Sequence, residues 1–124
     1  MLSVGSFLAY ASRMARTAVW LANIITFGLL FWQLDEGGPR VRAERGRRDP
    51  DFQFPQDAAR RAGFSPRLSD YLYVSVTNAI AVSPTDTMPL TRRAKGLMAV
   101  ESLISYAVVI LVVARAVNVL GASP

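Results

Sequence analysis

Residues 96–120 read GLMAVESLISYAVVILVVARAVNVL, and this run decides the fold class of the chain. Its centre, from Ser102 to Ala114, contains no charged residue. The run is rich in Ala, Val, Gly and Ser, a composition that suits close helix packing in lipid. A helix of this length covers the hydrocarbon core of a bilayer. We therefore expect a transmembrane helix within residues 92–124.

Two charged residues interrupt the run, Glu101 and Arg115. Each is close enough to one end for its side chain to reach the lipid headgroups. We expect both to be interfacial anchors. The alternative is a charge that lies between subunits or lines a pore.

A second apolar run, TAVWLANIITFGLLFWQL, covers residues 17–34 and contains no charge. At about 1.5 Å per residue it reaches roughly 27 Å as a helix, enough to cross the hydrocarbon core. Trp20 and Trp32 lie near its two ends, where membrane proteins place aromatic belts. A signal peptide is disfavoured because no small-residue cleavage site follows Leu34. We therefore expect residues 1–34 to form an N-terminal segment and a first transmembrane helix.

The composition excludes several classes of function. The 124 residues are 52% hydrophobic and carry a formal net charge of +5, which argues against a disordered chain. His and Cys are absent, so the commonest metal ligands, general base and thiol nucleophile are missing. The remaining carboxylates form no convincing pair. We expect no enzyme, no catalytic residue, no metal site and no cofactor.

Residues 35–64 are polar and rich in Arg, and we expect an extramembrane loop. The simplest interpretation is a solvated loop, since acids are interleaved with the arginines. The alternative is contact with anionic lipid headgroups. Nucleic acid is not an expected partner, because no aromatic residue is interleaved with these arginines. The lipid-contact candidates are Arg40, Arg42, Arg45, Arg47 and Arg48. Phe52 and Phe54 are expected to dock the loop on the membrane or on a neighbouring helix.

Residues 65–91 predict a short helix and then an irregular segment. Ser65 and Pro66 fit an N-cap followed by proline at the first helical position. A helix from there to Val82 reaches only about 22 Å, which is too short to cross the membrane and suits a re-entrant segment. The β-branched residues also allow a strand, but a lone strand in lipid leaves its edges unpaired. Residues 83–91, SPTDTMPLT, are polar and broken by proline.

From Tyr71 to Leu120 the chain resembles the pore module of potassium-channel-like proteins. In that family the chain runs from an aromatic start through a pore helix and a filter to an outer Asp, Pro and Thr, and then into an inner helix. The segment YLYVSVTNAIAVSPTDTMPLTRRAKGLM is also similar to small bacterial ion-channel-like membrane proteins. The matching positions are Tyr71, Leu72 and Tyr73 at the aromatic start, Thr77, Asn78 and Ala79 at the pore-helix end, Val82 in the filter, and Asp86, Pro89 and Thr91 at the outer mouth.

The filter departs from the family pattern. Ser83 and Thr85 replace its glycines and Pro84 replaces its tyrosine. Glycine allows the positive φ angles that aim successive carbonyls at one axis, and these residues do not. We therefore do not expect classical potassium selectivity. The expected ion pathway runs along Val82, Ser83, Pro84, Thr85 and Asp86, with a monovalent cation as its ligand. The alternative role for Asp86 is an N-terminal cap of the last helix.

The fold class is thus an all-α membrane protein with two transmembrane helices, a re-entrant pore helix and a filter-like loop between them. We expect a homo-oligomer in the lipid bilayer, four copies being implied by the resemblance, that conducts cations with poor selectivity. The alternative is a non-conducting accessory or scaffold subunit of a larger membrane complex.

The resemblance implies a multi-pass protein of the cell membrane with cytoplasmic termini and an outer loop. The charge count conflicts with this orientation, because eleven Arg and Lys residues lie between the two apolar runs and only three lie elsewhere. The connection between the runs is about as long as the limit at which that rule loses force.

Overall fold

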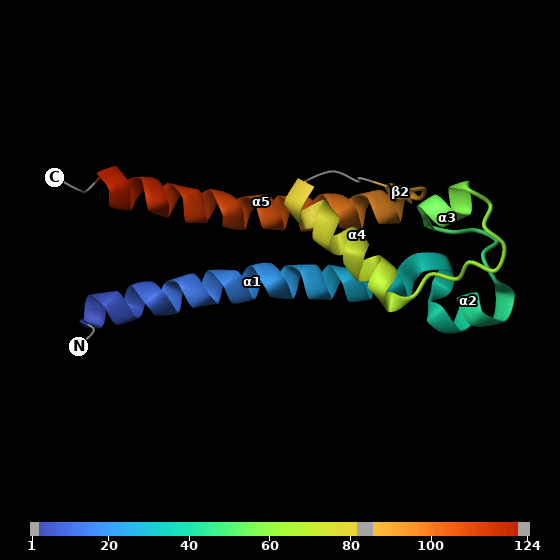
Figure 1. The fold of residues 1–124 in the computed structure, drawn as a ribbon, viewed down its shortest axis with the longest axis horizontal. Coiled ribbons are helices and arrows are strands. Elements are labelled where there is room, and N and C mark those ends of the chain that lie inside the picture. Colours follow the sequence, from blue (N-terminus) through green and yellow to red (C-terminus); the bar gives the residue numbers. More distant parts are fainter. Residues whose placement is uncertain (1–2, 82–85, 122–124) are drawn as a thin grey trace.

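Two long helices form the body of the structure, a computed structural model that describes residues 3–81 and 86–121. Helices α1 (Val4–Leu34) and α5 (Arg92–Gly121) run antiparallel, so both termini lie at the same end (Figure 1). The shorter helix α4 (Leu68–Ala81) packs obliquely against both, in the half of the molecule away from the termini. The predicted order of long helix, short helix and long helix is present.

Two helical segments, Val4–Arg45 and Arg92–Gly121, are long and apolar enough to cross a membrane. In the most apolar stretch of 18 residues, only 28% of the residues of the first segment and 22% of those of the second are buried. The core helix of a soluble protein would be mostly buried, whereas here large apolar side chains such as Leu103 and Val117 are 67% and 61% exposed. This exposed apolar surface favours a membrane protein.

Residues 35–64, predicted as a loop, fold into short elements. A single 3-10 turn, η1 (Asp35–Gly37), leads through Gly38 into α2 (Pro39–Arg45), and β1 (Phe52–Gln53) precedes α3 (Pro55–Ala58). Gly38 takes a φ of 112°, a conformation that glycine adopts readily. β1 pairs antiparallel with β2 (Met88–Pro89), with Phe52 opposite Pro89. The ladder joins the segment before α4 to the segment after it.

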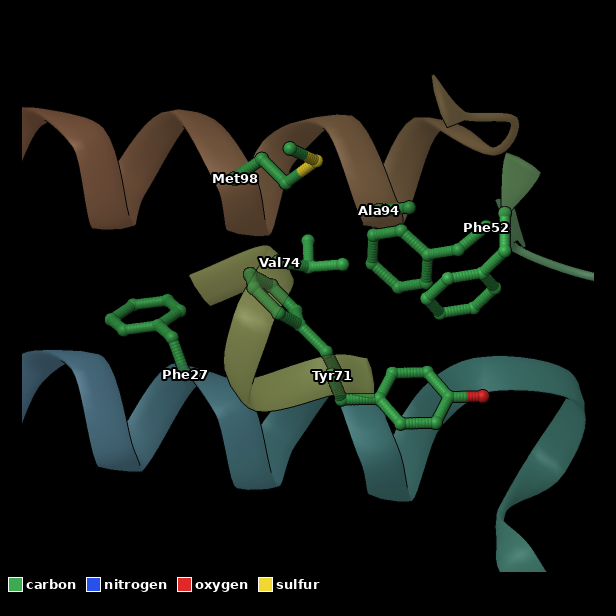
Figure 2. Close-up of a cluster of buried hydrophobic side chains, with 8 residues drawn as sticks. Phe27, Phe52, Tyr71, Val74, Ala94 and Met98 are labelled. Carbon is green, nitrogen blue, oxygen red and sulfur yellow. The ribbon is translucent and has the colours of Figure 1, made fainter. Parts of the chain in front are cut away.

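The hydrophobic core lies where α1, α4, α5 and β1 converge (Figure 2). The ring of Phe52 lies 5.2 Å from that of Phe31, and the ring of Phe54 lies 5.3 Å from that of Tyr71. Of the docking surfaces that the sequence predicts, Phe52 uses the long helix α1, whereas Phe54 packs on the short helix α4. The buried members of the core are Phe27, Phe31, Phe52, Phe54, Tyr71, Val74, Ala94 and Met98.

Helix α4 is a helix, as predicted, but it begins at Leu68 rather than at Pro66. The backbone N–H of Arg67 donates to Oδ2 of Asp70 at 2.7 Å, which is half of a capping box. Asp70 therefore stabilises this helix start in place of the expected Ser65 cap.

Helices α1 and α4 approach closely at Gly28. A Cβ atom at this position would lie 2.6 Å from Cδ2 and 3.3 Å from Cα of Leu72. Leu72 can move its side-chain terminus but not its backbone, so the contact requires glycine. At Gly96 of α5, by contrast, an added Cβ atom would have no other atom within 4 Å.

We predict that Gly28→Ala lowers the free energy of unfolding by about 1–3 kcal/mol, because overpacking separates α1 from α4. The matched substitution Gly96→Ala is expected to be neutral or stabilising by up to about 1 kcal/mol, as helix propensity alone dictates. Unfolding of both variants in detergent, followed by circular dichroism, measures the difference. Equal stabilities for the two variants would contradict the close packing.

Candidate functional site

The side chain of Glu101 is fully buried in the middle of the helix bundle, with 0% exposure. The expectation that it reaches the headgroups as an interfacial anchor is therefore wrong. Its carboxyl group points into the interface where α4 packs against α5, and α4 supplies polar side chains there. A buried carboxyl is stable only where such partners are present.

Two residues of α4 contact the Glu101 carboxyl. Asn78 donates from Nδ2 to Oε1 at 2.9 Å, and Ser75 Oγ is hydrogen-bonded to Oε2. The Asn78 amide also donates to the backbone carbonyl of Met98 at 2.9 Å and accepts at Oδ1 from Ser102 Oγ at 3.0 Å. All hydrogen-bonding atoms of the Asn78 side chain therefore have partners.

Helix α1 joins the same group of contacts. Asn23 donates from Nδ2 to the backbone carbonyl of Glu101 at 3.3 Å. We call Asn23, Ser75, Asn78, Glu101 and Ser102 the Glu101 network. All five residues are buried, and together they tie α1, α4 and α5 to one another.

A second interhelical contact lies one turn further along α5. The indole N–H of Trp20 donates to Ser105 Oγ at 3.0 Å, and Ser105 donates to the carbonyl of Ala79 at 2.7 Å. This contact again connects all three helices.

The number of available protons indicates the charge state of Glu101. Ser75 Oγ lies 2.6 Å from the carbonyl of Ile24 as well as against the Glu101 carboxyl. A hydroxyl has one proton and a carbonyl has none to donate. If Ser75 donates to Ile24, the proton between Ser75 and Glu101 must belong to the carboxyl group. No Arg or Lys among the described residues forms an ion pair with Glu101, so the arrangement favours a neutral carboxylic acid.

A second polar cluster lies at the end of the bundle away from the termini, around Asp35. This carboxylate has 0% exposure and accepts hydrogen bonds from Tyr71 Oη at 2.6 Å and from Arg47 Nη1 at 2.8 Å. Its other oxygen accepts the backbone N–H of Asp51 at 2.7 Å. Arg47 also forms a bidentate pair with Asp57, at 2.9 and 2.6 Å. We call Asp35, Arg47, Asp57 and Tyr71 the Asp35 cluster.

The environment of this cluster shifts the pKa values of two members. Burial, together with the hydrogen bond to Asp35, raises the pKa of Tyr71 well above its ordinary value. Burial alone lowers the pKa of Arg47, but its bonds to Asp57 and Asp35 raise it above the usual range. Tyr71 therefore stays neutral and Arg47 stays charged over the physiological pH range.

Asp51 connects the start of α5 to the folded loop. It accepts from Thr91 Oγ1 at 2.7 Å, from Arg93 at 3.1 and 2.8 Å, and from the backbone N–H of Glu36 at 2.9 Å. Burial acts to raise the pKa of Asp51, but the bonds from Arg93 and Thr91 outweigh it and lower the pKa below its ordinary value.

Two of the five lipid-contact candidates lie inside the protein. Arg42 is 5% exposed, donates to the backbone carbonyls of Trp32 and Asp35, and lies 4.9 Å from the ring centre of Tyr71. Arg47 is held in the Asp35 cluster. These two guanidinium groups satisfy backbone and carboxylate oxygens of the folded loop, so the alternative of lipid contact is wrong for Arg42 and Arg47. Arg40, Arg45 and Arg48 are exposed, so their contact with lipid stays a prediction.

The predicted ion-pathway residues are only partly within the described chain. Val82, Ser83, Pro84 and Thr85 lie outside the described residues, and Asp86 is exposed. Of the predicted pore-helix end, Asn78 and Ala79 are 1% and 3% exposed and face other helices, while Thr77 donates to the carbonyl of Val74 at 3.0 Å. Within one chain, Asn78 therefore holds helices together rather than facing a water path.

The sequence does carry a signal for the Glu101 network, in the spacing of its polar residues. Its members lie three or four positions from another polar residue within apolar helices, as in Ser75 and Asn78, or Glu101 and Ser105. Such spacing places them on one helix face. Among the described residues, no group of three or more Asp and Glu side chains could hold a metal ion. The chemistry that the network supports is the hydrogen bonding of a buried carboxyl group between helices.

Comparisons with models of protein families, with curated proteins and with solved structures find no match to this chain.

We predict that Glu101→Gln leaves the free energy of unfolding within about 1 kcal/mol of the original, because an amide replaces a neutral carboxyl group atom for atom. Glu101→Ala is expected to lower it by about 2–4 kcal/mol, since it leaves a cavity and removes partners from Ser75 and Asn78. Unfolding in detergent measures both. A Gln variant as unstable as the Ala variant would show that Glu101 is ionised.

Proposed function

We propose that this chain is a multi-pass membrane protein of the pore-loop type that assembles into an oligomer and conducts cations with poor selectivity. The observation that carries the proposal is the position of α4. A helix of 14 residues, too short to cross a bilayer, is held between two long apolar helices by buried side-chain hydrogen bonds.

The path of the chain around α4 supports a re-entrant segment. Tyr71, in the first turn of α4, contacts Asp35 at the loop end of the bundle. Ser75 and Asn78 lie deeper, level with Glu101, and the chain then returns so that Met88 and Pro89 pair with β1. Both ends of this segment are therefore at the same end of the molecule, as a pore loop requires.

The exposed end of α4 supports a role for cations. Ile80 is 64% exposed and Ala81 is also exposed, so the described residues leave the last two side chains of this helix open, while the carbonyl of Ala79 accepts from Ser105. The C-terminal end of a helix carries a partial negative charge that favours cations. Asp86 follows a few residues later and is exposed. Repeated around an axis, these groups would form a negatively charged ring.

Conduction requires more than one copy, because two long helices and one short helix are too few to enclose a water-filled path. A cyclic assembly with α4 towards the axis meets this requirement. Four copies are what the resemblance to potassium-channel-like proteins implies. We place the termini in the cytoplasm and the folded loop outside, in keeping with that resemblance. The residues Ser83, Pro84 and Thr85 argue against a potassium-selective filter.

The test is ion flux through the purified protein in liposomes, measured separately for potassium, sodium and chloride. We predict comparable potassium and sodium flux that exceeds chloride flux. Asp86→Asn is expected to lower the cation-to-chloride ratio about twofold or more, because it removes one charge per subunit at the mouth. Glu44→Gln, which removes an exposed carboxylate on α2, is the matched control and is expected to leave the ratio unchanged.

No flux above that of empty liposomes, at several voltages and pH values, would contradict conduction. In that case, crosslinking in native membranes separates the alternatives. A consistent foreign partner in place of a homo-oligomer would support an accessory or scaffold subunit.

A further inference from the structure

The half of the bundle nearest the termini contains a groove between α1 and α5. Helix α4 packs between the two long helices only in the other half (Figure 1). Two cavities of about 330 and 550 Å³ lie towards the termini and share Arg13, Arg16 and Val112 as lining residues. Because they share these residues, the cavities adjoin. We call them together the terminal groove.

Three arginines from two helices line the terminal groove: Arg13 and Arg16 of α1, and Arg115 of α5. The chain has no acidic residue before Asp35 and none after Glu101. Within the described residues, none of the three guanidinium groups takes part in an ion pair. The groove therefore carries three positive charges without a neutralising partner, unlike Arg47 and Arg93 at the opposite end.

The three charges lie within about 9 Å of one another along the helix axes, towards the surface of the expected membrane that is nearest the termini. The hydrogen bond between Trp20 and Ser105 sets the register of the antiparallel helices. From that level, a rise of 1.5 Å per residue places Arg16 about 6 Å, Arg13 about 10 Å and Arg115 about 15 Å further towards the termini. Arg13 is about 33 Å along α1 from Asp35, which is close to the thickness of a hydrocarbon core. The arginines are thus at headgroup level when Asp35 is at the opposite surface.

Apart from Thr17, the remaining walls of the terminal groove are apolar. Val108, Val109, Val112 and Val113 line the cavity nearer the bundle centre, together with Trp20. Ala9, Ala116, Val119 and Leu120 line the cavity nearer the termini. A ligand that fits must combine negative charge with a hydrocarbon chain.

We propose that the terminal groove binds an anionic phospholipid. Its phosphate group is held by Arg13, Arg16 and Arg115, and one acyl chain lies along the valines of α5. Arginine suits this role because its planar donors match the oxygens of a phosphate group. The proposal requires only that α1 and α5 cross the bilayer, and it does not depend on ion conduction.

Trp20 provides a direct probe, because it lines the groove. In a Trp32→Phe variant Trp20 is the only tryptophan, and its fluorescence can be quenched by lipids with brominated acyl chains. The protein is placed in phosphatidylcholine vesicles that contain a small fraction of brominated phosphatidylglycerol or, separately, brominated phosphatidylcholine. We expect the anionic lipid to quench Trp20 at a concentration at least about fivefold lower, since each nearby arginine contributes about that factor.

The variant Arg13→Gln, Arg16→Gln, Arg115→Gln is expected to abolish this preference. Replacement of the same three residues by Lys keeps the charge and is expected to retain most of it. The matched control replaces three exposed arginines elsewhere, Arg60→Gln, Arg61→Gln and Arg67→Gln, and is expected to retain the full preference.

Equal quenching by the two lipids in the parent protein would overturn the proposal, and would indicate neutral lipid or a second copy of the chain in the groove. A preference that persists in the Gln variant, or that is lost equally in the control variant, would also overturn it. The parent and control measurements do not depend on whether the Gln variant folds.

Discussion

The structure depends on one constraint: a fully buried carboxyl group, that of Glu101, must find hydrogen-bond partners where three helices meet. Glu101 meets it through Ser75 and Asn78 of α4, while Asn23 of α1 binds the backbone of Glu101 itself. In lipid, apolar contact gives little net drive for helix association, so hydrogen bonds and close packing decide which helices stay together. The Glu101 network supplies the hydrogen bonds, and the contact of Gly28 with Leu72 supplies the close packing.

The Asp35 cluster complements this network at the other end of α4. Tyr71 binds Asp35 in the first turn of α4, and Ser75 and Asn78 bind Glu101 one and two turns later. The helix is therefore attached near its start by the Asp35 cluster, outside the apolar region, and further along by the buried polar side chains of the Glu101 network, inside it. Each set of contacts suits the polarity of its surroundings. Residues 35–64, which are bound to α5 through the contact between Asp51 and Arg93, support the attachment of α4 at Tyr71.

The long helices and α4 could be predicted from the sequence because each depends on local composition. Uncharged runs of sufficient length indicate spans, and polar residues with flanking prolines indicate a shorter helix. The Asp35 cluster could not be predicted, because Asp35 and Tyr71 are 36 residues apart and meet only through the turn at Gly38 and the packing of Phe52. The position of Glu101 was predicted wrongly for a related reason. Its short distance from the end of an apolar run suggested a headgroup contact. In the structure, Ser75 and Asn78 of α4 lie at the same level as Glu101 and bind its carboxyl group instead.

The central claim is that α1 and α5 cross the bilayer with the Glu101 network between them. The chain has no cysteine, so single cysteines at Ser3 and at Glu44, both exposed, report the side on which each end of α1 lies. Labelling of intact cells with a membrane-impermeant thiol reagent is the most direct test. We predict that Glu44→Cys is labelled at once and that Ser3→Cys is labelled only after the membrane is permeabilised. Labelling of both cysteines from the same side would contradict the claim.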